Sequence, residues 1–354
     1  MSNRFLKLLG ERPFLMADGA TGTNLFGMGL MTGDSPELWN VEQPERIEAL
    51  HQSFVDSGAD LFLTNSFGGT RHRLKLHHAQ DRVHEINKRA AEIGRKVADR
   101  AMQEQPGREV IVAGSMGPTG ELFEPMGMLT DEMAFEAFAE QAVALKEGGV
   151  DVLWIETMYS REEMSAAVRG AAATGLPIVT TMSFDTNGKT MMGISPAEFV
   201  AFVHSLDPKP VAYGANCGVG ASDLVATIVK LSEAAAPDDV IVAKGNCGIP
   251  FYEEGKIKYN GTPELMADYA RIVRDAGARI VGGCCGTSPE HLKSIRSALH
   301  AHQPGARPSA AEIVSRLGPV TEGAAVLLAG GDISAAAPKR SRRRERGASE
   351  EAAF

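Results

Sequence analysis

The chain has 354 residues, of which 44% are hydrophobic and 23% are charged. This is the composition of a globular protein with one large domain or two medium ones, and it excludes a disulfide-stabilised miniprotein and a fibrous chain. A total of 36 Lys and Arg against 45 Asp and Glu gives a net charge of −9, so the body of the chain has no overall attraction for nucleic acid or anionic lipid.

Two features of the chain bear on its location. Residues 1–19 lack the uninterrupted apolar core of a signal peptide, and no apolar run reaches about 18 residues. We therefore expect a cytoplasmic protein with no membrane contact.

Short apolar segments alternate with amphipathic helical patterns along most of the chain. Three segments share one pattern, in which a helix ends at Gly and an apolar strand follows. The predicted strands lie within 14–17, 56–65, 109–114, 147–156, 177–182, 210–214, 239–244 and 275–284. The intervals between them carry amphipathic helical patterns, for example at 81–104, 131–147, 160–173, 221–235, 263–276 and 289–300. Eight such alternations predict an α/β fold, a (β/α)₈ TIM barrel over residues 1–302. The alternative, an open doubly wound sheet, lacks a strand–GxGxxG–helix unit.

The composition changes at residue 303. Residues 303–354 are rich in Ala, Gly, Ser and Pro, with one apolar patch at 324–330 and a basic cluster, KRSRRRER, at 339–346. We expect this segment to be a flexible low-complexity tail that is dispensable for chemistry. The basic cluster is typical of a solvated charged tail, although it has the charge to contact nucleic acid or an acidic surface.

Most of the predicted strands end on polar or sulfur-bearing side chains. In a barrel the loops that follow the strands converge on one mouth, where chemistry takes place. A single Asn or Thr at a strand end is explained by solvent, but three cysteines and two acids at strand ends are not. The residues at these ends include Asp18, Asn65, Glu156, Thr157, Asn216, Cys217, Lys244, Cys284 and Cys285.

The cysteines indicate a metal site. Cys217 lies in GANCGVG, and Cys284 and Cys285 follow 67 and 68 residues later in GGCCGTSPEH. If the sixth and eighth strands are next-but-one neighbours, three thiolates can share one metal. Zinc favours such ligands, and three of them leave a fourth position open for a substrate. Cys247 is interpreted as a bystander, because three ligands suffice. The alternatives are buried core cysteines, a redox-active vicinal disulfide, and a structural four-cysteine site that includes Cys247.

A three-thiolate zinc predicts one kind of reaction. Such a centre carries net negative charge, so it activates water poorly but can carry another thiolate. Metal binding lowers the pKa of a substrate thiol, and the resulting thiolate can attack an electrophilic carbon. The simplest reaction that fits is an S-alkylation.

Several motifs resemble the homocysteine S-methyltransferase family, in matching order over residues 10–300. They are DGATGT (18–23), the segment 44–70, GSMGPTG (114–120), IET (155–157), GANCGVG (214–220) and GGCCGTSPEH (282–291). The Asn-Cys pair together with Gly-Gly-Cys-Cys-Gly is the most specific part. The resemblance implies a zinc-dependent barrel that moves a methyl group to the thiolate of L-homocysteine, giving methionine. It makes Cys217, Cys284 and Cys285 the zinc ligands.

The resemblance also implies a set of substrate-binding residues. It places the catalytic acids Asp18 and Glu156 and the Gly19 backbone around the amino-acid end of homocysteine, with Asn216 beside them. A pair of carboxylates suits an ammonium group, and backbone N–H groups suit a carboxylate. The alternative is that Asp18 caps a loop, Glu156 is a surface acid in an ion pair, and Asn216 only ends its strand.

The methyl donor is the least constrained part of the prediction. We favour betaine or a similar small onium donor, which aromatic faces hold by cation–π attraction, with Trp39, Phe67 and Tyr159 as candidates. Gly68, Gly69 and Thr157, however, stand where vertebrate-type betaine enzymes carry aromatic residues. The alternative is the homocysteine-activating subunit of a split methionine synthase, which docks a separate cobalamin-binding protein. Two other classes are a Schiff-base aldolase acting through Lys244 and a non-catalytic zinc-binding module.

Overall fold

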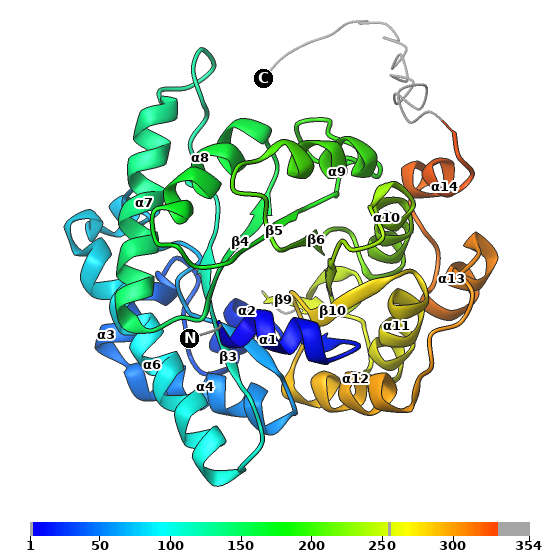
Figure 1. Cartoon of the computed structure of the whole chain (residues 1–354), viewed down its shortest axis with the longest axis horizontal. Helices are drawn as coiled ribbons and strands as arrows, with labels where there is room; N and C mark the ends of the chain where they lie inside the picture. The colour runs from blue at the N-terminus through cyan, green and yellow to red at the C-terminus, as the bar shows by residue number, and fades with distance from the viewer. Residues whose placement is uncertain (1–2, 254–255, 332–354) are drawn as a thin grey trace, which may run out of the picture.

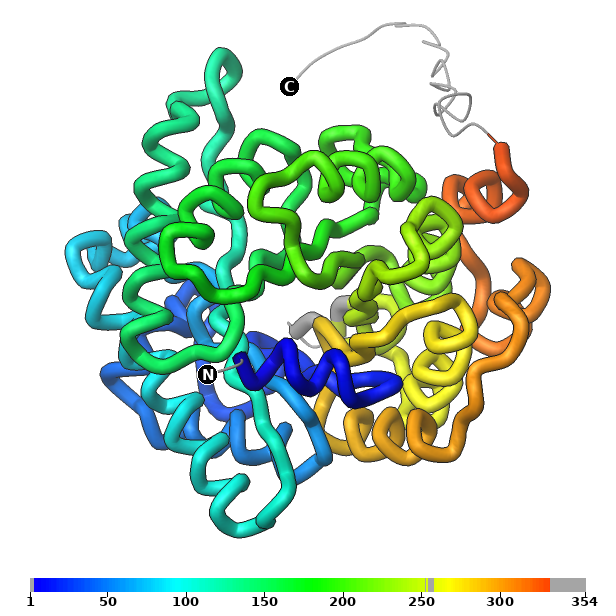
Figure 2. The backbone as a smooth tube through the Cα atoms, viewed as in Figure 1, coloured from blue at the N-terminus to red at the C-terminus, as the bar shows by residue number. Residues whose placement is uncertain are grey.

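Eight parallel strands form a barrel with helices packed around it in the computed structural model, which describes residues 3–253 and 256–331 (Figures 1 and 2). The strands follow one another in the order β1 (Leu15–Met16), β10 (Ala278–Gly283), β7 (Ile241–Gly245), β6 (Ala212–Cys217), β5 (Ile178–Met182), β4 (Val152–Met158), β3 (Ile111–Met116) and β2 (Leu61–Leu63). The predicted (β/α)₈ barrel is confirmed, and the doubly wound sheet is wrong.

One buried carboxylate closes the seam between β1 and β2. The backbone N–H of Asp60 donates to the Met16 carbonyl at 2.8 Å, and the Met16 N–H donates to the Asp60 carboxylate at 2.8 Å. Arg12 and Arg296 each donate to the same carboxylate at 2.8 Å. Asp60 therefore joins the two terminal strands of the sheet, and two guanidinium groups offset the cost of burying its charge.

The inside of the barrel is an apolar core that is closed at one end. Strand residues such as Leu63, Trp154 and Val242 cluster there with Phe5, Leu8 and Leu9 of α1 (Arg4–Glu11). Helix α1 runs across the end of the barrel in Figure 1. Because α1 covers the ends where the strands begin, the opposite ends remain for a site.

A second and larger apolar core lies between the barrel and its helices. Several of these helices begin at a Ser or Thr whose side chain caps the first turn, as Thr130 and Ser195 do. The main helices are α4 (Pro44–Asp56), α6 (Val83–Glu104), α7 (Asp131–Gly148), α8 (Arg161–Ala172), α9 (Pro196–Ser205), α10 (Ala221–Ala234), α11 (Pro263–Asp275) and α12 (Pro289–Ala301). Within the described residues, none of the helices has the length and apolar character needed to cross a membrane.

The loops after the strands carry short elements of their own. Those after β1 and β2 hold α2 (Thr21–Gly27), η1 (Pro36–Leu38), α3 (Trp39–Glu42), α5 (Arg71–Leu74), η2 (Lys75–His77) and η3 (Gln80–Arg82). After β7 the chain forms an antiparallel hairpin of β8 (Pro250–Glu253) and β9 (Lys256–Tyr259). The sequence analysis did not predict this hairpin, whose two strands have only four residues each.

The flexible tail predicted from residue 303 is wrong for part of its length. Residues there form α13 (Ala310–Leu317) and α14 (Glu322–Leu328), with Ile313 and Leu317 buried in the outer core. Asp223 of α10 also accepts a 2.5 Å hydrogen bond from the Thr321 hydroxyl just before α14. These helices form because their apolar residues recur at helical spacing and find a partner face on the barrel. The basic cluster at 339–346 lies outside the described residues.

Candidate functional site

Three cysteines meet where β6 and β10 end. The Sγ of Cys217 lies 2.7 Å from that of Cys284 and 4.0 Å from that of Cys285, and all three sulfurs lie within 4.8 Å of one another. They converge because β6 and β10 flank β7 in the barrel, so that the ends of both strands open on the same mouth. The structure thus brings together the three residues that the sequence predicted as ligands.

The backbone around the cysteines is held by several hydrogen bonds. The Cys284 N–H donates to the Gly245 carbonyl at 2.7 Å, and the Cys285 N–H donates to Asn246 Oδ1 at 3.1 Å. The turn continues through Gly286, whose φ of +80° suits glycine. The loop after β7 therefore supports the vicinal pair from behind.

The donor set fits a zinc ion. A tetrahedral zinc with bonds of about 2.3 Å separates its sulfur ligands by roughly 3.8 Å, which a small rearrangement of this cluster provides. Hydrogen bonds from the thiols of Cys217 and Cys284 hold the pKa of Cys285 well below its usual range, while the pKa of Cys217 is raised. The cluster therefore favours a single thiolate, because three thiolate charges so close together would repel one another. A bound divalent cation would displace the protons of the other two thiols.

Cys247 is not part of this cluster in the described chain. Its side chain is buried, which raises its pKa to about 12, and its backbone N–H donates to the Cys285 carbonyl at 2.8 Å. A four-cysteine structural site is therefore not formed by the described residues.

Asn216 links three strands to the cysteines. Its Nδ2 donates to Thr157 Oγ1 at 2.7 Å and contacts the Cys284 sulfur at 3.9 Å. Its Oδ1 accepts from the Thr157 N–H at 3.0 Å and from the Thr181 hydroxyl at 2.6 Å. Asn216 is fully buried, and these hydrogen bonds connect β6 to the residues that follow or end its neighbouring strands. The interpretation that Asn216 only ends its strand therefore does not hold.

Asp18 and Lys244 form a buried ion pair at 2.5 Å between the ends of β1 and β7. The other oxygen of Asp18 accepts from the Leu63 N–H at 2.8 Å, so both carboxylate oxygens are engaged. Burial opposes the charge on Lys244, but the carboxylates of Asp18 and Glu156 outweigh it, and the pKa of Lys244 is raised. A lysine held protonated in this way is a poor Schiff-base nucleophile, which argues against the aldolase interpretation.

Glu156, at the end of β4, is a buried acid rather than a surface one, with 8% of its area exposed. Its Oε1 accepts a 2.5 Å hydrogen bond from the Ser115 hydroxyl, and its Oε2 has no hydrogen-bond partner in residues 3–253 and 256–331. Burial raises the pKa of Glu156 to about 7, although the charge of Lys244 acts in the opposite direction. One carboxylate oxygen thus remains available to a cation.

The loop that contains Gly19 packs tightly against the loop after β10. A Cβ at Gly19 would lie 2.6 Å from the Thr287 carbonyl oxygen, and the Ala20 N–H donates to that oxygen at 3.1 Å. Gly19 is therefore required where these two loops meet.

The three aromatic residues named for the donor do not share one environment. Trp39 is buried in the outer core with the Arg46 guanidinium 4.8 Å above its ring, so a protein cation already occupies that face. Phe67 is 37% exposed in the loop after β2 and lies against Gly117, where a Cβ would meet the ring at 2.5 Å. Tyr159 is partly buried after β4. Trp39 therefore has no exposed ring face on which the cation of a methyl donor could bind.

Two residues near the site were missed by the sequence reasoning. Ser115 of β3 orients Glu156, and Tyr259, at the end of the hairpin, packs its ring on Gly286, the residue after Cys285. No motif marks a single Ser or Tyr for such a role, and the hairpin itself was not predicted.

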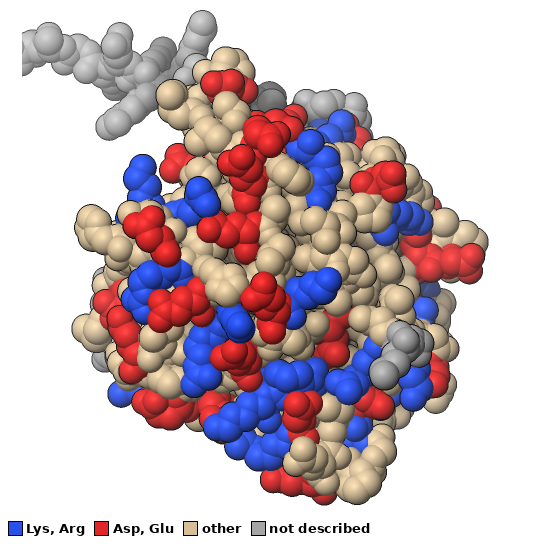
Figure 3. Space-filling model, turned by 60° about the vertical axis from the view of Figure 1, so that its left-hand side comes forward, with Lys and Arg blue, Asp and Glu red and all other residues tan. Residues whose placement is uncertain are grey.

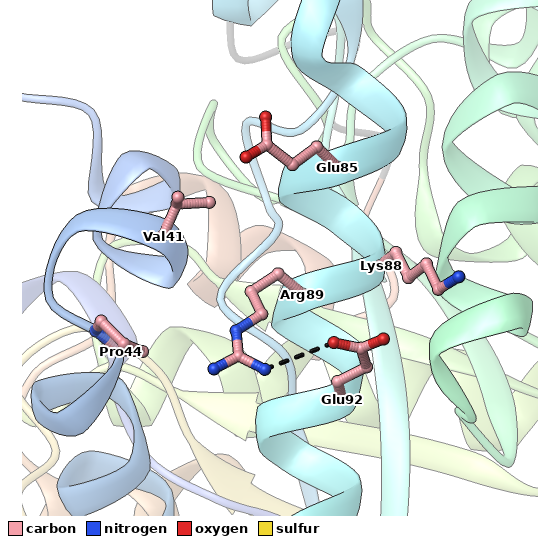
Figure 4. Close-up of a pocket in the computed structure, with 6 residues that line it drawn as sticks. All are labelled: Val41, Pro44, Glu85, Lys88, Arg89 and Glu92. Carbon is pink, nitrogen blue, oxygen red and sulfur yellow. Dashed lines mark hydrogen bonds and ion pairs between the residues drawn. The ribbon is translucent and has the colours of Figure 1, made fainter.

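Among the described residues, no second cluster of metal-binding side chains accompanies the three cysteines. Acidic and basic side chains are interspersed over the face shown in Figure 3, where α3, α4, α6 and α7 lie. A pocket of about 350 Å³ opens there beside α6, with Arg89 and Glu92 paired at 3.3 Å (Figure 4). It is lined by Val41, Pro44, Glu85, Lys88, Arg89 and Glu92, none of which belongs to the cysteine site.

The chain belongs to the homocysteine S-methyltransferase family, whose model matches residues 15–299. The match begins with β1 and ends within α12, so it includes all eight strands of the barrel. The family resemblance read from the sequence is thus confirmed.

Individual relatives agree with this assignment. The metallated form of the homocysteine methyltransferase MmuM from Escherichia coli superposes with a TM-score of 0.70 at 25% identity, covering 83% of this chain and 99% of that one. Methionine synthase from Mycobacterium tuberculosis is 28% identical over 92% of this chain, and that from Mycobacterium leprae is 29% identical over 83%. The chain spans only 28% and 25% of the lengths of these two synthases.

Proposed function

We propose that this enzyme transfers a methyl group to the sulfur of L-homocysteine, giving methionine, with zinc held by Cys217, Cys284 and Cys285. The observation that carries the proposal is the convergence of three free cysteine sulfurs within 4.8 Å at the mouth of a barrel of this family. Bound zinc would lower the pKa of the substrate thiol, so that a thiolate is present at neutral pH. The similarity to MmuM, whose structure has been solved in a metallated form, supports a metal-dependent enzyme.

Glu156 is suited to bind the ammonium group of homocysteine. Its free Oε2 lies in a buried setting, where a carboxylate without a cation is costly. An arriving ammonium group stabilises the charged form of Glu156 and forms a charge-assisted hydrogen bond. Ser115 holds the other carboxylate oxygen and so fixes the orientation.

Asp18 acts indirectly in this scheme. Both of its oxygens are engaged by Lys244 and the Leu63 N–H, so Asp18 positions Lys244 rather than binding substrate. Lys244 then supplies a fixed positive charge beside Glu156. The Gly19 backbone remains the proposed contact for the substrate carboxylate. Asn216 has a supporting role, because it holds Thr157 and contacts the sulfur of Cys284.

We propose betaine or a similar small onium compound as the first donor to test, with Phe67 and Tyr159 as the aromatic faces. A cation–π contact with either ring would orient the methyl group toward the sulfur site. The engaged face of Trp39 removes it from this set.

A separate cobalamin-carrying protein is the second candidate donor. It is favoured by the exposed apolar side chains that gather in the loops after the strands, where Met126 and Met128 are 69% and 81% exposed. Exposed apolar side chains in such number are typical of a protein contact. They are Phe26, Met31, Phe67, Leu76, Leu122, Met126, Met128, Met191, Met192, Ile249 and Phe251. The similarity to part of two methionine synthases points the same way.

Methionine formation tests both candidates. Zinc-loaded protein is supplied with homocysteine and either betaine, S-methylmethionine or a methylcobalamin-carrying protein. Cys284→Ala serves as the inactive variant, and Cys247→Ala as the matched control that keeps its zinc. Methionine from a small onium compound supports the first donor, and methionine from the cobalamin protein alone supports the second. A zinc-loaded protein that makes no methionine with any donor would instead fit a non-catalytic module.

A further inference from the structure

The loop after β5, residues 183–195, lies at the mouth of the barrel between two parts of the site. On one side the Thr190 hydroxyl donates to the Tyr159 carbonyl at 3.0 Å. On the other side the Phe184 carbonyl oxygen lies 3.9 Å from where a Cβ on Gly218 would be, and Gly218 directly follows the first cysteine of the site. This β5 loop therefore connects a proposed donor-binding residue with the surroundings of the metal site.

The tip of the β5 loop is a tight two-residue turn. Thr186 and Lys189 exchange backbone hydrogen bonds at 3.0 and 3.1 Å. Asn187 and Gly188 between them have φ angles of +52° and +77°, as an Asn-Gly hairpin turn requires. The shape of the tip is therefore defined by its own backbone.

Helix α14 packs directly on this tip. A Cβ added to Gly323, in the first turn of the helix, would lie 2.4 Å from backbone atoms of Asn187. A Cβ on Gly188 would lie 3.5 Å from the Leu327 side chain, which is an ordinary packing distance. Backbone atoms cannot rotate away as a side chain can, so the close contact requires glycine at position 323.

The start of α14 is anchored to the first turn of α10, which follows β6. The Thr321 hydroxyl donates to Asp223 at 2.5 Å, and the Ser222 hydroxyl donates to the Pro319 carbonyl at 2.9 Å. Asp223 is only 7% exposed, so its carboxylate depends on such partners. Helix α14, which lies beside α10 in Figure 1, is thus fixed at the mouth end of the barrel.

The position of α14 relative to the site separates the two substrates. The residues proposed for zinc and homocysteine lie at the ends of β1, β4, β6 and β10, whereas α14 packs on the loop after β5. A displaced β5 loop would act first on Tyr159, through the hydrogen bond from Thr190. Helix α14 also lies beyond residue 299, where the match to the family model ends.

We propose that α14 positions the β5 loop for binding of the methyl donor, through the packing of Gly323 and the anchoring of Thr321. Both are positioning residues, because they act through the loop and not on a substrate. The proposal rests on the proposed function, since it assigns the Tyr159 side of the mouth to the donor. The expectation that all residues after 302 are dispensable for chemistry then fails for α14.

Two variants displace α14 by different routes. Gly323→Ala adds one methyl group against the Asn187 backbone, and it raises the helix propensity, so it does not weaken α14 itself. Its matched control is Gly10→Ala, the same substitution in α1, where the new Cβ meets open space. Thr321→Val removes the hydroxyl that donates to Asp223, and Thr321→Ser, which keeps a hydroxyl, is its matched control.

Three measurements are made on full-length, zinc-loaded protein. Hydrogen–deuterium exchange with mass spectrometry follows the peptides that cover residues 183–195. Calorimetry gives the affinity for homocysteine. The methionine assay gives the KM for whichever of betaine, S-methylmethionine or a methylcobalamin-carrying protein the wild type uses. The Tm and the zinc content are determined for every variant.

In Gly323→Ala and Thr321→Val we expect the β5 loop to exchange roughly tenfold faster than in wild type. The KM for the donor should rise roughly three- to tenfold, while homocysteine affinity and zinc content stay at wild-type values. Gly10→Ala and Thr321→Ser should match wild type in all three measurements.

The outcomes separate this role from a merely structural one. Unchanged exchange in the β5 loop overturns the proposal, and so does faster exchange or a lower Tm with an unchanged donor KM. Equal losses of donor and homocysteine binding also overturn it, because the effect would then not be confined to the donor side. A wild type that makes no methionine with any of the three donors refutes the proposed function, whereas faster exchange confined to Gly323→Ala and Thr321→Val still supports the positioning of the loop by α14.

Discussion

Replacing Asp18 by Asn should destabilise the protein by removing one partner of a buried ion pair. Asp18 is fully buried and Lys244 is 3% exposed, so neither charge is screened by water. Loss of one member of such a pair costs about 3–5 kcal/mol, because the remaining charge stays buried without its partner. Glu156 still acts on Lys244, and the new Asn can still accept from the Leu63 N–H, so we expect about 3 kcal/mol.

Urea unfolding followed by far-UV circular dichroism measures this loss, with zinc content determined on the same samples. The matched control is the double variant Asp18→Asn/Lys244→Met, which removes both charges and keeps a side chain of similar length. We expect it to recover at least half of the lost free energy of unfolding. A single variant within about 1 kcal/mol of wild type, or a double variant no more stable than the single one, would refute the reasoning.

Three further predictions concern the metal, the substrate and the C-terminal helices. Metal analysis should find about one zinc per chain, lost on Cys217→Ala, Cys284→Ala or Cys285→Ala but kept in Cys247→Ala; retention of full zinc by any of the first three contradicts the ligand set. Glu156→Gln should weaken homocysteine binding by roughly one to two decades in calorimetry. Because the pKa of Glu156 is raised to about 7, its carboxylate is charged only above that pH, so wild-type affinity should fall as the pH drops below 7, whereas the variant should lose this pH dependence. Truncation after residue 302 removes the buried side chains of Ile313 and Leu317, each contributing about 1.5–3 kcal/mol, so it should lower the Tm measured by thermal unfolding; an unchanged Tm would contradict their packing on the barrel.

Much of the site could be anticipated because its ligands follow predictable strands. The alternation of apolar strands and amphipathic helices fixes the end of each strand, and a barrel brings those ends to one mouth. The positions of Cys217 and the vicinal pair therefore indicate one shared metal site, and the family resemblance implies that they are its ligands. The same reasoning failed for the tail, because low-complexity composition concealed apolar residues at helical spacing in 310–328.

The sequence by itself determined the barrel, the family and the three cysteines that the barrel brings together, since periodicity and short motifs encode them locally. Only the tertiary structure decided the partners of the charged groups. Asp18 pairs with Lys244, 226 residues away, and Glu156 is buried beside Ser115 of a neighbouring strand. The physical reason is that pairing and burial depend on which loops pack together in space, and no local pattern records that packing. For the same reason only the tertiary structure places Tyr259, on an unpredicted hairpin, against Gly286, the residue after Cys285.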